Sequence, residues 1–96
     1  MKLIRIIYKK VNYKVQIAAS KSQIYIKNEW QDLGYLIEVI EENKHLKYQI
    51  GGFPTYKSVQ NALKNIAAKG YKECFVVAYS NGNRISLAEA KILSGE

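Results

Sequence analysis

The 96-residue chain has one cysteine and one histidine, and this scarcity excludes several kinds of structure and chemistry. A single cysteine cannot form a disulfide within the chain, so cysteine usage leaves the redox compartment undetermined. Cys74 stands in the strand-like run Cys-Phe-Val-Val-Ala and is interpreted as a small core residue. His45 lies in a charged loop without metal-ligand spacing to Cys74. The sequence therefore predicts no metal site and no histidine-based catalysis.

The chain also lacks a long apolar run and a catalytic constellation. No stretch approaches the roughly 18 apolar residues of a membrane span. The short apolar run at residues 3–7 is interrupted by Arg5 and precedes no small-residue cleavage site, so residues 1–10 are interpreted as an extended arm or an added strand. Gly51-Gly52 lacks the Lys and Ser/Thr of a phosphate loop and is interpreted as a strand end where the backbone bends closely into a helix. We expect a non-enzymatic domain with no cofactor.

Acidic residues are absent from two long segments, residues 1–28 and 44–72, and the formal net charge is +7. A basic surface of this kind favours a polyanionic partner, which could be nucleic acid, anionic lipid or an acidic polysaccharide. The alternative is that the lysines only keep a small domain soluble.

An internal duplication organises the rest of the sequence. The segment Tyr13-Lys-Val-Gln-Ile-Ala-Ala-Ser20 resembles Leu46-Lys-Tyr-Gln-Ile-Gly-Gly-Phe53, and both alternate apolar and polar residues as a half-buried strand does. In each half the polar face, which is predicted to be exposed, carries Lys and then Gln. These residues are Lys14 and Gln16 in the first half, and Lys47 and Gln49 in the second.

A helix and a second strand follow each of these strands. Apolar residues at helical spacing, starting at Val59 and ending before Gly70, predict the second helix, whereas the pattern between residues 20 and 34 predicts a weaker first helix. Residues 35–40 and 74–79 are the second strands, and residues 41–45 form a polar hairpin loop. The predicted fold is α+β, a βαββαβ ferredoxin-like (RNA-recognition-like) sandwich with both helices on one face of a four-stranded antiparallel sheet.

Three segments are predicted along the chain: an arm at residues 1–10, the main domain at 11–85 and a short C-terminal helix at 86–96. A tight turn at Asn81-Gly82-Asn83 precedes Arg84-Ile85, which could add a short return strand. Ser86 and Glu89 match a capping box that opens the terminal helix.

Taken in order, these motifs resemble the SPOR (sporulation-related repeat) domain. That family carries two weak repeats of the form Tyr-x-Val-Gln-apolar-small-small, each followed by a helix. The chain has Tyr13-Lys-Val-Gln-Ile-Ala-Ala-Ser20, Tyr48-Gln-Ile-Gly-Gly-Phe53 and the closing Gly70-Tyr-Lys-Glu-Cys-Phe-Val-Val-Ala-Tyr79. The stretch Phe-Val-Val-Ala-Tyr-Ser-Asn-Gly is similar to SPOR domains attached to cell-wall amidases in Bacteroidetes-like bacteria. The likeness spans residues 11–85.

The resemblance implies a periplasmic module that binds peptidoglycan glycan strands stripped of their peptide stems, the material enriched at the division septum. It implies a fused or associated amidase as a partner, with no membrane span in the domain, and we expect a monomer. Binding would use the open face of the sheet, where muramic acid carboxylates suit Lys14 and Lys47. The predicted glycan-binding residues are Lys14, Gln16, Ser20, Lys47, Gln49, Phe75 and Arg84.

Two other functions fit parts of the sequence. The same topology and charge suit a single-stranded RNA-binding module, but the third strand lacks the alternating aromatic residues that stack bases, which disfavours nucleic acid. The apolar segment at residues 3–7 could instead pair with a sheet edge in a protein-interaction or assembly domain.

Overall fold

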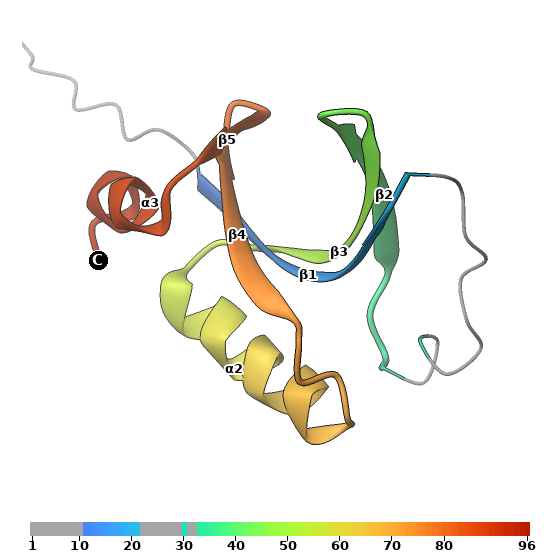
Figure 1. Cartoon of the computed structure of the whole chain (residues 1–96). Coiled ribbons are helices and arrows are strands. Elements are labelled where there is room, and N and C mark those ends of the chain that lie inside the picture. Colours follow the sequence, from blue (N-terminus) through green and yellow to red (C-terminus); the bar gives the residue numbers. More distant parts are fainter. Residues whose placement is uncertain (1–10, 22–29, 31–32) are drawn as a thin grey trace, which may run out of the picture.

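The computed structural model describes residues 11–21, 30 and 33–96, which form an antiparallel sheet with two helices (Figure 1). In sheet order the strands are β2 (Ile37–Glu42), β3 (His45–Phe53), β1 (Val11–Ser20), β4 (Phe75–Ser80) and β5 (Asn83–Ile85). The helices are α2 (Tyr56–Ala68) and α3 (Leu87–Ser94). The α+β class and the antiparallel sheet are confirmed.

The predicted count of four strands is wrong, because the described part of the sheet has five. Asn81 and Gly82 both have positive φ, 53° and 80°, and this tight turn brings the chain back along β4. The returning strand β5 places Arg84 opposite Tyr79. The sequence contained the turn signal, but three residues are too few to show the alternation by which a strand is recognised.

Two predicted elements lie outside the described residues. The arm at residues 1–10 is one, and most of the first helix, between residues 20 and 34, is the other. The two described apolar residues of that second segment, Trp30 and Leu33, are both buried in the core. The Trp30 ring lies 5.7 Å from the ring of Tyr48 in β3, so Trp30 packs against the sheet.

Helix α2 begins and ends where its sequence indicates. Thr55 is the N-cap, and it exchanges the two hydrogen bonds of a capping box with Ser58. The buried residues Val59, Ala62 and Ile66 recur at helical spacing. The apolar stripe therefore holds α2 against the sheet, as predicted.

Helix α3 also follows its sequence signals. The Ser86 hydroxyl accepts a hydrogen bond from the Glu89 backbone N–H, and Gly95 ends the helix with φ of 78°. Its buried residue Ala90 joins the same core cluster as Val59 of α2. Both described helices therefore contribute to one core.

The sheet is curved, with α2 under its convex face and the concave face free of described helices (Figure 1). Alternate residues of each strand point to opposite faces, so half of them enter the core. The core side of the three central strands carries Tyr13 and Val15 of β1, Tyr48 and Ile50 of β3, and Val76 and Ala78 of β4. The intervening residues face the concave side.

Strands β1 and β3 approach closely at Gly51-Gly52. A Cβ built on Gly51 would lie 3.0 Å from the Tyr13 carbonyl oxygen and 3.1 Å from the Lys14 Cα. The register also shifts there, from Tyr13 opposite Phe53 to Lys14 opposite Gly51. The glycines permit this close approach of the two strands because they have no Cβ.

Candidate functional site

The concave face collects polar side chains from all five strands. Lys14 and Gln16 come from β1, Lys47 and Gln49 from β3, Tyr79 from β4, Glu38 and Glu42 from β2, and Arg84 from β5. Val77 of β4 lies among them and is buried, although it does not belong to the core cluster under α2. The duplicated Lys-x-Gln motif thus lies on the face that the sequence predicted.

The two glutamines are buried and hydrogen-bonded to each other. Gln49 Nε2 donates to Gln16 Oε1 at 3.2 Å and to the Tyr79 hydroxyl at 2.8 Å. Gln49 is fully buried, Gln16 is 5% exposed and Tyr79 is 7% exposed. The prediction that these glutamines are exposed is wrong, because side chains from the flanking strands fold over them. They form the floor of the concave face.

Glu42 reaches over this floor from β2. Its carboxylate accepts a hydrogen bond from the Tyr79 hydroxyl at 3.0 Å. It also forms an ion pair with Arg84, whose Nη1 lies 3.1 Å from Glu42 Oε1. We call this three-residue contact between Glu42, Tyr79 and Arg84 the Glu42 clasp. It joins β2 to β4 and β5, across the two strands that lie between them in the sheet.

The three cations of this face, Lys14, Arg84 and Lys47, differ in their contacts with acidic and aromatic side chains. Lys14 Nζ lies 3.4 Å from Glu38 Oε2 and 5.3 Å from the centre of the Tyr79 ring. Arg84 lies 5.8 Å from the same ring while it pairs with Glu42. Lys47 is half-buried and has no ion-pair partner among the residues that the structure describes. The acids of β2 therefore neutralise two of the three cations.

The environment of Tyr79 alters its acidity. Burial is the main cause that raises the pKa of its hydroxyl, and the nearby Glu42 carboxylate raises it further. The hydrogen bond from Gln49 and the charge of Arg84 oppose this effect. The Tyr79 hydroxyl therefore stays protonated at neutral pH and can donate to a carboxylate.

The SPOR domain family model matches residues 9–78, more than half of the chain. The chain belongs to the SPOR domain family. No curated protein and no solved structure shows significant similarity to it. SPOR domains are non-catalytic modules that bind peptidoglycan, and they occur in cell-envelope proteins and direct division proteins to the septum.

Of the two remaining residues of the predicted glycan-binding set, Phe75 lies beside the glutamine floor of this SPOR domain and Ser20 lies on the opposite face of the sheet. Phe75 lies opposite Gln16 at one end of β4, with 47% of its surface exposed. Ser20 lies opposite Leu46, which packs against the core. A β-bulge between Gln16 and Ala18 changes the phase of β1 before Ser20, so Ser20 shares the face of Leu46 rather than that of Gln16.

The sequence reasoning missed Glu38 and Glu42 as members of this face. Glu38 and Glu42 share the period-two spacing of one strand face, which was the available signal. Glu42 was interpreted instead as part of a solvated hairpin loop. The turn is shorter than that prediction, with only Asn43 and Lys44 between β2 and β3, so Glu42 belongs to the strand.

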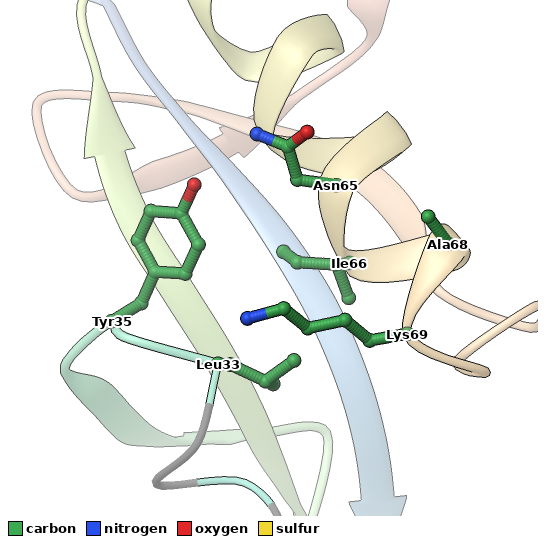
Figure 2. A pocket seen from close by; sticks show the side chains of 6 residues that line it. All are labelled: Leu33, Tyr35, Asn65, Ile66, Ala68 and Lys69. Atoms are coloured by element: carbon green, nitrogen blue, oxygen red, sulfur yellow. The ribbon is translucent and has the colours of Figure 1, made fainter.

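A pocket of about 330 Å³ lies on the helix side of the SPOR domain, between the last turns of α2 and the segment before β2 (Figure 2). Leu33 and Ile66 line it with apolar side chains, and the Lys69 side chain reaches toward Tyr35 (Figure 2). It is lined by none of the concave-face residues. Figure 2 therefore shows a feature separate from the candidate site.

Cys74 is half-buried against the core, as predicted, and burial raises the pKa of its thiol, which disfavours the reactive thiolate. Within the described residues no three His, Cys, Asp or Glu side chains gather as metal ligands would. None of the described helices has the length and apolarity needed to cross a bilayer.

Proposed function

We propose that this domain binds peptidoglycan glycan strands stripped of their peptide stems, through the concave face of its sheet, in the periplasm. In this role it directs an attached cell-wall or division protein, such as an amidase, to the septum. Membership of the SPOR family supports peptidoglycan as the ligand. The observation that carries the choice of face is its composition: an exposed aromatic ring beside a floor of side-chain amides and a set of cations.

Each part of this face suits a part of an amino-sugar polymer. The half-exposed Phe75 ring offers a flat apolar surface for a sugar ring. Lys47 offers a cation without an internal ion-pair partner among the described residues, which suits a sugar carboxylate. The buried Gln16 and Gln49 act differently from the direct contacts that their sequence pattern predicts, because they fix the shape of the floor.

Co-sedimentation with purified sacculi tests this proposal, before and after an amidase removes the peptide stems. We expect stripping to increase the bound fraction, and Phe75→Ala to reduce it severalfold. Ile92→Ala is the matched control, since Ile92 is an exposed apolar residue of α3 outside the concave face. A protein that stays in solution with both preparations would overturn the proposal. Equal loss of binding in the two variants would remove Phe75 from the site.

Single-stranded RNA remains the comparison ligand for the same assay. Tyr48, which occupies the third strand, packs into the core against Trp30 and cannot stack a base on the open face. Glu38 and Glu42 also pair with two of the three cations on that face, which leaves little positive charge for a continuous phosphate backbone. We therefore expect RNA binding to be weak and to vanish at moderate salt concentration.

A further inference from the structure

The Glu42 clasp has the composition of a carboxylate-binding site whose ligand is a side chain of the same chain. Two donors from different strands converge on the Glu42 carboxylate, the Tyr79 hydroxyl at 3.0 Å and Arg84 Nη1 at 3.1 Å. A hydroxyl and a guanidinium are typical partners of a carboxylate in protein recognition sites. Figure 1 shows why they meet, since the β2–β3 and β4–β5 hairpins rise on opposite sides of the concave face.

We propose that Tyr79 and Arg84 form the binding site for a carboxylate of the glycan strand, and that Glu42 occupies this site as an internal competitor. The inference rests on the proposed function, because it assigns a position on the same face to the acidic group of the same ligand. Each muramic acid of a stripped strand carries a lactyl carboxylate. That group replaces the Glu42 carboxylate on the two donors when the strand binds.

A second observation at the same place points to a ligand. Gln49 Oε1 is buried and has no hydrogen-bond partner, although Gln49 Nε2 makes two hydrogen bonds. Gln49 lies directly under the clasp, since the Tyr79 hydroxyl contacts both Gln49 and Glu42. Displacement of Glu42 uncovers an acceptor that the closed state leaves unsatisfied. A hydroxyl or an acetamido N–H of the sugar can donate to this oxygen.

The partial exposure of the Glu42 clasp allows a ligand carboxylate to replace the Glu42 carboxylate. The Arg84 side chain is 38% exposed and the Glu42 side chain is 22% exposed, so water screens the ion pair. Such partly exposed pairs contribute little to stability and are displaced readily. A competitor that occupies the site for part of the time lowers the apparent affinity of the ligand in proportion. Removal of the Glu42 charge should therefore tighten binding.

The experiment compares Glu42→Gln with Glu41→Gln. Both variants remove one negative charge from β2, but Glu41 is exposed and lies opposite Leu46, on the face away from the clasp. The probes are stripped glycan strands with free lactyl carboxylates, and the same strands after these carboxylates are coupled to methylamine. We expect Glu42→Gln to bind the free-carboxylate strands roughly five- to tenfold more tightly than the wild type. Glu41→Gln should bind like the wild type.

The neutralised strands and a further variant separate the outcomes. Binding to neutralised strands should be the same in the wild type and Glu42→Gln, and Arg84→Gln should prefer the free-carboxylate strands less than the wild type does. If the wild type binds glycan but Glu42→Gln and Glu41→Gln behave alike, the internal competitor is overturned and the proposed function stands. If the wild type and all variants bind neither kind of strand, the proposed function fails, and this inference fails with it.

Discussion

The Glu42 carboxylate accepts a hydrogen bond from the Tyr79 hydroxyl at 3.0 Å. Glu42 belongs to β2 and Tyr79 to β4, and strands β3 and β1 lie between these two in the sheet. Adjacent strands lie about 4.8 Å apart, so a flat sheet would hold β2 and β4 about 14 Å from each other. The curvature seen in Figure 1 brings the two hairpin ends within reach. The contact therefore spans the concave face, through which we propose that glycan binds.

The ionisation of Tyr79 provides a direct test of this contact. We expect Tyr79 to titrate above the ordinary tyrosine pKa of 10.0, because burial and the Glu42 carboxylate both disfavour the phenolate. Since the pKa is raised in the folded state, the contribution of Tyr79 to the free energy of unfolding is fully present below the ordinary pKa of 10.0. It is lost as pH rises through the folded-state pKa. The measurement is an NMR titration of the tyrosine ring carbons, with Tyr79→Phe to assign the signal.

Glu42→Gln should lower the pKa of Tyr79 in the same titration, since the Glu42 carboxylate is one of the causes that raise it. Glu41→Gln should have no such effect, because Glu41 points to the opposite face. A Tyr79 pKa that is the same in the wild type and in Glu42→Gln would show that the clasp is open in solution.

Gln16→Ala should destabilise the protein. The substitution removes the acceptor of the Gln49 amide at 3.2 Å and leaves a small void among buried side chains. The loss of one hydrogen bond to a buried group lowers the free energy of unfolding by about 1–3 kcal/mol. Urea unfolding measures this, with Lys47→Ala as the control, because that side chain is half-buried on the same face and has no ion pair among the described residues.

An unfolding curve for Gln16→Ala that coincides with that of the wild type would contradict the buried amide pair. The result also governs how binding data are interpreted. Loss of glycan retention in Gln16→Ala is not by itself evidence of a direct contact, because the substitution disturbs the floor on which Tyr79 rests.

The sequence predicts local features of this fold well and long-range features poorly. The alternation in residues 13–17 and 46–50 identifies both faces of β1 and β3, and the spacing of Val59, Ala62 and Ile66 identifies the buried side of α2. These patterns depend only on the periods of strands and helices. The burial of Gln16 and Gln49 depends instead on which side chains reach across from β2 and β4. That reach follows from sheet curvature, which no short-range pattern encodes.

The bulge in β1 is a second example. Alternation continued beyond Gln16 would place Ser20 on the concave face, since Gln16 and Ser20 are four residues apart. One extra residue before Ala18 reverses the phase and turns Ser20 toward the side of Leu46. A bulge is a property of the pairing of two strands, and the sequence of β1 alone does not specify it.

Gly51→Ala should be more harmful than Gly52→Ala. A Cβ on Gly51 would approach the backbone of β1, at 3.0 Å from the Tyr13 carbonyl oxygen, so the two strands would have to separate. A Cβ on Gly52 would instead meet the Asn12 side chain at 2.5 Å, and that side chain is exposed and can rotate. We expect Gly51→Ala to lower the free energy of unfolding by roughly 1–3 kcal/mol.

Thermal or urea unfolding of both variants checks this difference. Asn12→Ala combined with Gly52→Ala serves as the control, because removal of the Asn12 side chain should relieve any clash at Gly52 and leave the stability near that of Asn12→Ala alone. Equal stability of Gly51→Ala and the wild type would contradict the close approach of β1 and β3.

The C-terminal residue Glu96 should make stability depend on pH in the acid range. Its carboxylate accepts hydrogen bonds from the Tyr56 backbone N–H, at 2.9 Å and 2.8 Å to its two oxygens, and so caps the first turn of α2. These bonds lower the pKa of Glu96 below its ordinary value of 4.5. Because the pKa is lowered on folding, the contribution of Glu96 to the free energy of unfolding is complete above about pH 4.5 and is lost as pH falls through the folded-state pKa.

We expect Glu96→Gln to have a lower melting temperature than the wild type at pH 7 and the same melting temperature at pH 2. Glu89→Gln, which keeps the backbone N–H bond to Ser86, serves as the control. A melting difference for Glu96→Gln that is unchanged between pH 7 and pH 2 would show that the charge of Glu96 has no part in holding α3 to the start of α2.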